Sequence, residues 1–300
     1  PGGFIKREGK PSERAILTSR VIDRQMRPRF PKDLRNDVSI VNMVMSVEQD
    51  NSPEFASIMG SIIATCISDI PFNGPIAGVI LGLIDGQVVI NPNTEQRKQS
   101  QMYVTLSADK EKIVMIEAGG NEIPDDVMLN AIKQGHEEIK RLINFIEDIV
   151  QAAGKEKFAY KSMAVPQDIF NDVMQACKEE LSEAMMNDDK TIRDKNVSEV
   201  SKKVHALLDE KYPEQVLQVS EAFYKLQKKI VREKILYEGK RVDGRGLMDI
   251  RPLSAQVGIL PRAHGSGLFQ RGQTQVLTNV TLGPMGDVQM LDGVDEAETK

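Results

Sequence analysis

The hydrophobic pattern of this chain changes its period twice, and this change is what most constrains the fold. For about seventy residues after Pro166, apolar side chains recur every three or four positions, as they do along one face of a helix. Strand-like runs of β-branched residues occur before and after this stretch but not inside it. Because one sheet cannot run through such a chain, the sequence predicts an all-helical region between two regions that combine helices with strands.

Three apolar stripes define the helical region, and each has the spacing of one helix face. They consist of Ile169, Val173, Cys177, Leu181 and Ala184, then of Val197, Val200, Val204 and Leu207, and finally of Val216, Val219, Phe223, Leu226 and Ile230. The charged residues between the stripes are typical of solvated helix faces rather than of a binding surface. We therefore expect a compact module of helices.

The region before the helices is predicted to be a mixed α/β layer on a largely antiparallel sheet. Asp85-Gly86 between two β-branched runs is a strong hairpin signal. Ser12 and Ser52 can each cap the start of a helix. The expected elements are a helix from Ser12 to about Arg27, a strand at 37–47, a helix ending before Pro71, two strands within 76–92, strands at 101–108 and 112–119, and a helix from Pro124 to about Ala153.

After Tyr237 the pattern returns to strands. The segments DIRPLSAQVGIL, GSGLFQRG and TQVLTNVTLG predict three strands joined by glycine-containing turns. A region of about sixty residues buries too little surface to be stable alone. The expected fold class is therefore α/β (α+β), with a mixed-sheet domain at 1–153, an all-helical linker domain at 154–237 and a partial mixed-sheet domain at 238–300.

The composition is that of a globular protein and limits the classes of function. The net charge of −5 argues against a protein that covers duplex DNA with basic residues. The longest apolar run, Ala77 to Ile84, is too short to span a membrane, and the first residues lack a signal-peptide core. We therefore expect a cytoplasmic protein with no membrane partner. Cys66 and Cys177 are expected to be free buried thiols, and the isolated histidines predict no zinc site.

The first 29 residues are cationic although the whole chain is acidic. They contain eight Lys or Arg and three Asp or Glu, a net charge of 8 − 3 = +5. Arg20, Arg24 and Arg27 share one helix face, where guanidinium groups can bind successive phosphates. Equally, these arginines can form ion pairs with carboxylates such as Asp23, and their spacing does not decide between the two interpretations.

The other polar motifs differ in how strongly they indicate a function. Phe4 stands close to Lys6 and Arg7, a combination that suits single-stranded nucleic acid because bases stack on rings while phosphates contact cations. The motif RVDGRG is more typical of a salt-bridged turn than of a phosphate site. His264 and Ser266 have no acid partner nearby in the sequence and are weak candidates for a nucleophilic pair. No glycine cluster has the Gly-Lys-Ser/Thr ending of a P-loop.

Two groups of motifs resemble the polynucleotide phosphorylases (polyribonucleotide nucleotidyltransferases). GGFIKREGKPSERAILTSRVIDRQMRPRFP, IPFNGPIAGV and NPNTEQRKQSQMYVTL resemble the first core domain of that family, and RVDGRGLMDIRPLSAQVGILPRAHGSGLFQRGQTQVLTNVTLG resembles the start of its second. The helical region matches the all-helical linker of the family. The resemblance covers essentially the whole chain, and it implies a central segment with parts of two ribonuclease PH-like core domains.

The resemblance implies processive 3′-to-5′ phosphorolysis of single-stranded RNA, with inorganic phosphate as co-substrate and release of nucleoside diphosphates. It also implies a role in mRNA degradation, a homotrimer around a central channel, a requirement for Mg²⁺ and association with other RNA-degradation enzymes. In the family, RNA is bound by a loop and by helix arginines, which match Phe4, Ile5, Lys6 and Arg7 and Arg20, Arg24 and Arg27. Family members often have two aromatic residues and two arginines in that loop, so the run here predicts a weaker grip on RNA.

The resemblance assigns no catalytic residue to this chain. The phosphate-binding serines and metal-binding aspartates of the family match positions expected beyond Lys300, so no catalytic and no metal residue is predicted here. The equivalent site in the first core domain of the family is usually not functional. The leading hypothesis is an enzyme, and the alternative is an RNA-binding and assembly scaffold without chemistry of its own.

Overall fold

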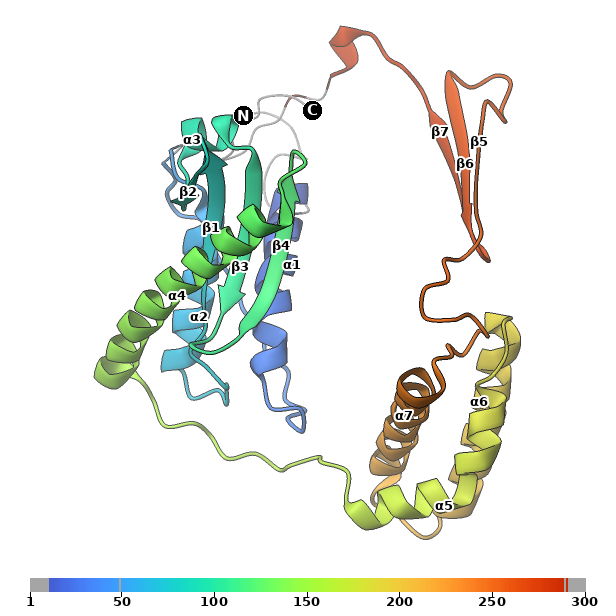
Figure 1. Cartoon of the computed structure of the whole chain (residues 1–300). Coiled ribbons are helices and arrows are strands. Elements are labelled where there is room, and N and C mark those ends of the chain that lie inside the picture. The colour runs from blue at the N-terminus through green and yellow to red at the C-terminus, as the bar shows by residue number, and fades with distance from the viewer. Residues whose placement is uncertain (1–10, 49, 289, 291–300) are drawn as a thin grey trace. The chain divides into compact units, whose positions relative to one another are not determined.

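The computed structural model describes residues 11–48, 50–288 and 290 of the chain. Within them the chain forms two compact units, residues 11–162 and residues 163–290, and each is described by itself (Figure 1). None of the helices in these residues is long and apolar enough to cross a bilayer.

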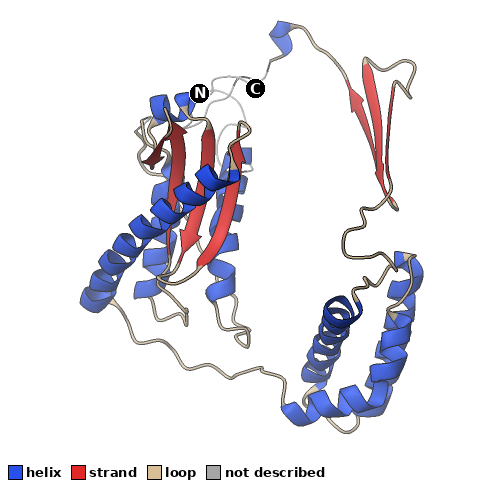
Figure 2. Ribbon diagram, in the orientation of Figure 1, coloured by secondary structure: helices blue, strands red, loops and turns tan. Residues whose placement is uncertain are grey.

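The first unit is a four-stranded sheet with helices on both faces (Figure 2). The strands lie in the order β2-β1-β3-β4, and every neighbouring pair is antiparallel. The elements are α1 (Glu13–Met26), a 3-10 turn (Arg27–Arg29), α2 (Pro53–Ile67), β1 (Ala77–Ile84), β2 (Gln87–Ile90), α3 (Thr94–Gln99), β3 (Met102–Ala108), β4 (Ile113–Gly120) and α4 (Asp125–Ala153). This confirms the predicted α/β layer on an antiparallel sheet.

Local signals set the ends of several of these elements. Ser12 and Ser52 each accept a hydrogen bond from a backbone amide in the first turn of the following helix, so they cap α1 and α2 as predicted. Asp85 and Gly86 join β1 to β2, and both have positive φ, at 49° and 76°. Such a two-residue turn matches the twist of an antiparallel pair, which confirms the predicted hairpin.

Strand β1 is buried because helices cover both faces of the sheet. Every residue from Ala77 to Leu83 is buried. On one face, Gly78 lies against α2, since a Cβ atom added to it would be 3.1 Å from Cγ2 of Ile58. Leu81 points to the opposite face, where α4 covers the strand. The core of the unit therefore lies in two layers, one on each side of the sheet.

The close approach of α4 to the sheet requires a glycine at position 135. A Cβ atom there would lie 2.9 Å from a methyl carbon of Leu81 and 2.9 Å from one of Leu106, and both leucines are fully buried. Gly60 in α2 is a matched contrast, because nothing lies within 4 Å of the corresponding position.

We expect Gly135→Ala to lower the free energy of unfolding by about 1–3 kcal/mol, because the added methyl group overpacks the core. Gly60→Ala is expected to raise it by about 0.5–1 kcal/mol, because alanine is the better helix former and has room. Urea titration of the two variants measures the sign of both changes in the free energy of unfolding. A gain in stability for Gly135→Ala would contradict the packing described here.

The second unit contains the helical region. Its helices are α5 (Gln167–Ala184), α6 (Lys190–Leu208) and α7 (Val216–Glu233), followed by a short π-helical turn (Lys234–Glu238). The helices share one core, and most of the predicted stripe residues are buried in it or packed against it. Leu207 and Val216 are exceptions, at 65% and 36% exposure. Leu208 is buried in place of Leu207, and both have a spacing from Val204 that places them on one helix face, four and three positions.

The second unit also contains an antiparallel sheet. Its strands are β5 (Leu253–Val257), β6 (Gly265–Arg271) and β7 (Thr274–Val280), in the order β5-β6-β7, and they confirm the three predicted strands. Every side chain of β5 and β7 is exposed. This exposure agrees with the expectation that the region buries too little surface to be stable alone.

Residues 37–47 form no strand, which corrects the sequence analysis. No backbone hydrogen bond joins residues 38–47 to another residue in the described part of the chain. β-propensity reflects packing against cross-strand neighbours, so a β-branched run becomes a strand only beside another strand. The sheet of the first unit already ends at β2 and β4 and does not include this run.

The chain that leaves α4 returns to α2 before it reaches the helical region. The ammonium group of Lys157 donates hydrogen bonds of 3.2, 2.8 and 2.6 Å to backbone oxygens at the end of α2, those of Thr65, Cys66 and Ser68. Tyr160 and Ser162 donate to the carboxylate of Asp33 at 3.0 and 2.6 Å. Residues 154–162 therefore contact the first unit, and the compact units divide between Ser162 and Met163.

Candidate functional site

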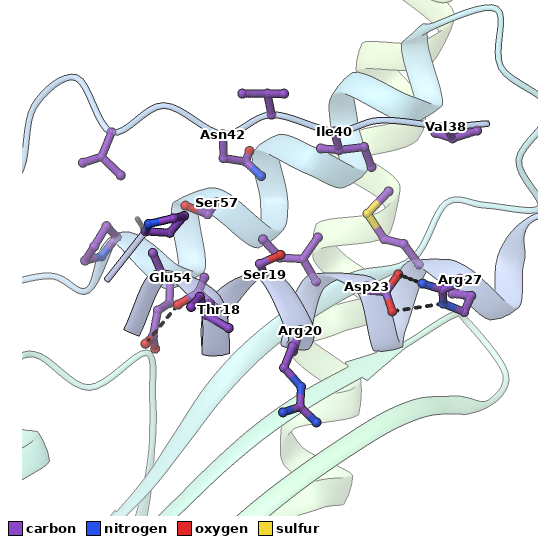
Figure 3. Close-up of a pocket in the computed structure, with 18 of the residues that line it drawn as sticks. Thr18, Ser19, Arg20, Asp23, Arg27, Val38, Ile40, Asn42, Glu54 and Ser57 are labelled. Atoms are coloured by element: carbon purple, nitrogen blue, oxygen red, sulfur yellow. Dashed lines mark hydrogen bonds and ion pairs between the residues drawn. The ribbon is translucent and has the colours of Figure 1, made fainter. Parts of the chain in front are cut away.

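The cationic helix α1 forms one wall of a groove on the first unit (Figure 3). The groove has a volume of about 840 Å³, and residues 30–44 and the start of α2 complete its lining. Apolar side chains such as Ile22 and Met26 line it together with the charged Arg20, Asp23 and Arg27. A groove of this mixed character can take a ligand with both apolar and anionic parts.

The three predicted arginines differ in their ion pairs. Nη1 of Arg24 lies 2.6 Å from Oε2 of Glu117 in β4. Arg27 donates to both carboxylate oxygens of Asp23 at 3.0 and 2.6 Å, and this pairing raises the pKa of its guanidinium group above the usual value. Arg20 has no hydrogen bond or ion pair with another described residue, and its side chain points away from Ile40 and Asn42 in Figure 3.

These contacts support the ion-pair interpretation of the arginine spacing, and phosphate binding stays a prediction. Asp23 pairs with Arg27, as the ion-pair alternative expects. Glu117 could not be found from the sequence as the partner of Arg24, because it lies 93 positions away. Exposed ion pairs are weak because water screens them, so a phosphate group can replace either carboxylate. Arg20 can bind a phosphate directly.

Tyr103 is a candidate residue that the sequence analysis did not identify. In the β3–β4 register Thr105 lies opposite Glu117, so Tyr103 and Thr105 share the face of the sheet that carries the partner of Arg24. The ring is 40% exposed, and its partial burial raises the pKa of the hydroxyl group. An exposed ring on the side of α1 can stack on a base. The two-residue alternation of QMYVTLSA is the signal that could have indicated this face.

The remaining sequence candidates take part in local structure or lie outside the described residues. The predicted RNA-binding loop lies outside the described residues, and it consists of Phe4, Ile5, Lys6 and Arg7. Nδ1 of His264 and Oγ of Ser266 each accept a hydrogen bond from a backbone amide at 2.9 Å. Arg245 donates to one carboxylate oxygen of Asp243 at 2.9 and 2.8 Å, which confirms a salt-bridged turn. Within the described ranges, no group of three or more His, Cys, Asp or Glu residues could hold a metal ion.

Cys66 and Cys177 are free and buried, as predicted. Burial raises the pKa of both thiols to about 11. The thiolate form, which is the nucleophile, is therefore scarce at neutral pH. Both residues serve packing rather than chemistry.

Models of three protein-family domains match this chain. The model of the 3′ exoribonuclease family, domain 1, matches residues 2–71 and 249–297, and that of domain 2 of the same family matches residues 74–138. The model of the polyribonucleotide nucleotidyltransferase RNA binding domain matches residues 168–246, which include α5, α6 and α7.

Curated proteins are similar to the chain along its whole length. The polyribonucleotide nucleotidyltransferase of Ruminiclostridium cellulolyticum is 64% identical over 300 residues, and those of Lachnoclostridium phytofermentans and Caldicellulosiruptor saccharolyticus are 50% and 49% identical over 299 and 300 residues. Each alignment covers 99–100% of this chain but 43% of the relative, so the chain spans less than half of their length. The crystal structure of rice Rrp46 aligns with 46% of this chain and 66% of its own, at 15% identity and a TM-score of 0.37.

Proposed function

The chain belongs to the polyribonucleotide nucleotidyltransferases, and on that premise we propose that it holds RNA in an enzyme that degrades single-stranded RNA processively from the 3′ end. In this reaction inorganic phosphate attacks the terminal phosphodiester bond, and one nucleoside diphosphate leaves at a time. The observation that carries the proposal is the cationic face of α1, where Arg20 is unpaired among the described residues and Arg24 and Arg27 hold only exposed carboxylates.

Single-stranded RNA suits this face because of its geometry as well as its charge. Arg20 and Arg24 are one helical turn apart, and Arg27 follows in the next turn. Each guanidinium fork can form two parallel hydrogen bonds with a phosphate group. Tyr103, exposed on the same side of the sheet, supplies a ring on which a base can stack. RNA bound in this way loses affinity as salt rises, because binding releases counterions.

The proposal derives no catalytic step from the described residues. No group of three or more His, Cys, Asp or Glu residues that could hold a metal ion occurs among them. The carboxylates nearest to the cationic face, Asp23 and Glu117, are held in ion pairs. We place the residues that bind Mg²⁺ and phosphate in other parts of the protein.

Family membership also supports the wider setting of the proposed reaction. We propose that the whole protein acts as a homotrimer in the cytoplasm and degrades mRNA together with other RNA-degrading enzymes. The catalytic groups of the trimer then act on the 3′ end of an RNA strand that α1 helps to hold.

An RNA-binding and assembly scaffold without chemistry of its own is the second candidate. It is favoured by the match of the helical region to an RNA binding domain, together with the lack of a metal-ligand cluster among the described residues. Both candidates require RNA binding, so only an assay of the chemistry of the whole protein separates them.

We expect the 300-residue chain to bind a single-stranded oligoribonucleotide and to release no nucleoside diphosphate from poly(A) in the presence of phosphate and Mg²⁺. The reason is that positioned charge and metal ions carry most of phosphoryl-transfer catalysis, and the described residues contain no group of three or more His, Cys, Asp or Glu that could hold a metal ion. Fluorescence anisotropy measures binding, with a duplex of the same sequence as the control, and chromatography of labelled products measures release.

Absence of binding to the single strand would overturn the proposed function. Release of diphosphates by the purified chain would show that it contains the catalytic residues, and it would exclude the scaffold.

A further inference from the structure

Helices α6 and α7 bring a serine, a histidine and an aspartate into one hydrogen-bonded row. Oγ of Ser220 in α7 lies 3.1 Å from Nε2 of His205 in α6. Nδ1 of the same ring lies 2.9 Å from Oδ1 of Asp209, which follows His205 by four positions. This order of groups, hydroxyl to imidazole to carboxylate, is that of a serine nucleophile with its general base and the acid that orients the base.

The row depends on the helical region alone. His205 lies in the last turn of α6, Asp209 directly follows that helix, and Ser220 lies in the second turn of α7. Both helices contribute to the shared core of the region, and the model of the RNA binding domain matches residues 168–246, which include both of them. The two contacts therefore need no residue from another part of the protein.

The carboxylate fixes the position of the proton on the ring. An ionised carboxylate only accepts hydrogen bonds, so Nδ1 of His205 carries the proton and donates it to Asp209. Nε2 of the neutral ring then has a free lone pair and accepts from the hydroxyl group of Ser220. The backbone carbonyl of Val216 is a second acceptor for this hydroxyl group, at 3.3 Å. The two acceptors compete for one proton, and the imidazole is the nearer of them.

The helix ends beside the row favour the charges that a transfer reaction creates. His205 lies at the C-terminus of α6, where the helix dipole stabilises an imidazolium ion in addition to Asp209. No side chain caps the N-terminus of α7, and its first three backbone amides have no acceptor among the described residues. A helical side chain lies over the turn before its own Cα atom, so the hydroxyl group of Ser220 lies over this positive end. Negative charge on a carbonyl oxygen under attack is stabilised there.

Small molecules in solution can reach the row. Ser220 is exposed, and the side chains of His205 and Asp209 are 26% and 39% exposed. An open position of this kind suits a small acyl donor with a good leaving group. Phosphate is such a leaving group, because it departs as an anion and needs no proton from the protein.

We propose that Ser220 is a nucleophilic serine that accepts an acyl group from an acyl phosphate, with His205 as the general base and Asp209 as a positioning residue. Oγ of Ser220 attacks the carbonyl carbon of the donor, and its proton moves to Nε2 of His205. A C–O ester bond forms, the C–O bond to the phosphate group breaks, and phosphate leaves with the bonding electrons. The imidazolium ion then releases its proton to water. The product is one serine ester on α7 for each phosphate released.

Incubation of the 300-residue chain with acetyl phosphate tests the proposal. Peptide mass spectrometry measures the rate of acylation at each serine, and neutral hydroxylamine, which cleaves esters but not amides, distinguishes serine esters from acetylated lysines. Ser198 in α6 is the matched control within the same chain, because it is exposed and its hydroxyl group has no hydrogen bond with another described residue. Ser220 is expected to react at least about a hundredfold faster than Ser198, as general-base catalysis provides. Similar rates at the two serines would overturn the proposal.

Two variants test the roles of the histidine and the aspartate. His205→Gln supplies no base, so the rate at Ser220 is expected to fall to within about threefold of the rate at Ser198. Asp209→Asn no longer holds the ring in the required tautomer and is expected to lower the rate at Ser220 at least about tenfold. Circular dichroism checks the helical content of each variant, and if either one unfolds, the ratio of the two serines in the unchanged chain still decides. A rate at Ser220 that is the same in folded His205→Gln would overturn the proposal.

Discussion

Replacement of Arg20, Arg24 and Arg27 together by alanine is expected to weaken binding to single-stranded RNA and to flatten its salt dependence. Each phosphate group that the protein no longer neutralises lowers the slope of log K against log salt by about 0.7 for a single strand, so the removal of three such cations lowers it by about 2. A fluorescent oligoribonucleotide titrated at several salt concentrations gives both the affinity and the slope.

The matched control removes three cations on the opposite side of the sheet. These cations are Lys110, Lys140 and Arg141, and each is exposed and paired with a glutamate. Lys110 pairs with Glu147 of α4, and the other two lie on α4 itself. Their replacement by alanine changes the net charge by the same amount and is expected to leave most of the slope in place. If the two triple variants behave alike, only net charge matters, and the assignment of RNA contacts to α1 fails.

Single variants measure how much each arginine contributes to RNA binding. Arg20→Ala is expected to cost more affinity than Arg24→Ala, because Arg24 must first give up Glu117. Glu117→Gln removes that competitor without changing the size of the side chain, so it is expected to strengthen RNA binding. Weaker binding of Glu117→Gln would indicate that the carboxylate positions Arg24 rather than competes for it.

Leu226→Ala is expected to lower the free energy of unfolding of the helical region by about 2–5 kcal/mol, because it leaves a cavity that the neighbouring helices fill only in part. Leu226 is fully buried in the core that α5, α6 and α7 share. Leu217→Ala in the same helix is the control, since that side chain is 69% exposed, and a change within about 0.5 kcal/mol is expected. Urea titration followed by circular dichroism compares the two, and equal reductions in stability would contradict the described packing of α7.

The features predicted from the sequence are those that depend on neighbouring residues in the chain. The Asp85-Gly86 turn needs two positive φ angles, which these residue types tolerate, and the signal is complete within two positions. The caps at Ser12 and Ser52 act within one helical turn. The three helices of the second unit follow from a periodicity that each segment carries by itself.

The features that the sequence analysis missed depend on distant partners. Residues 37–47 have the composition of a strand, but pairing requires another strand, and no local signal reports whether one is present. The ion pair between Arg24 and Glu117 depends on the arrangement of α1 over β4, which the spacing of the arginines cannot reveal. Leu207 was predicted to lie in the core, where the structure has Leu208. The sequence could not distinguish the two, because residues three or four positions apart both lie on one helix face.

Lys157 makes the stability of α2 depend on a part of the chain that is synthesised much later. The last turn of α2 contains no basic residue. The positive charge that stabilises its terminal carbonyl groups comes instead from the ammonium group of Lys157, 92 positions after Thr65 in the sequence. The end of α2 is therefore complete only when α4 has formed and the chain has returned across the unit. Opening of residues 154–162 removes the ammonium group from those carbonyl groups, so we expect the end of α2 and residues 154–162 to open together rather than to fray separately.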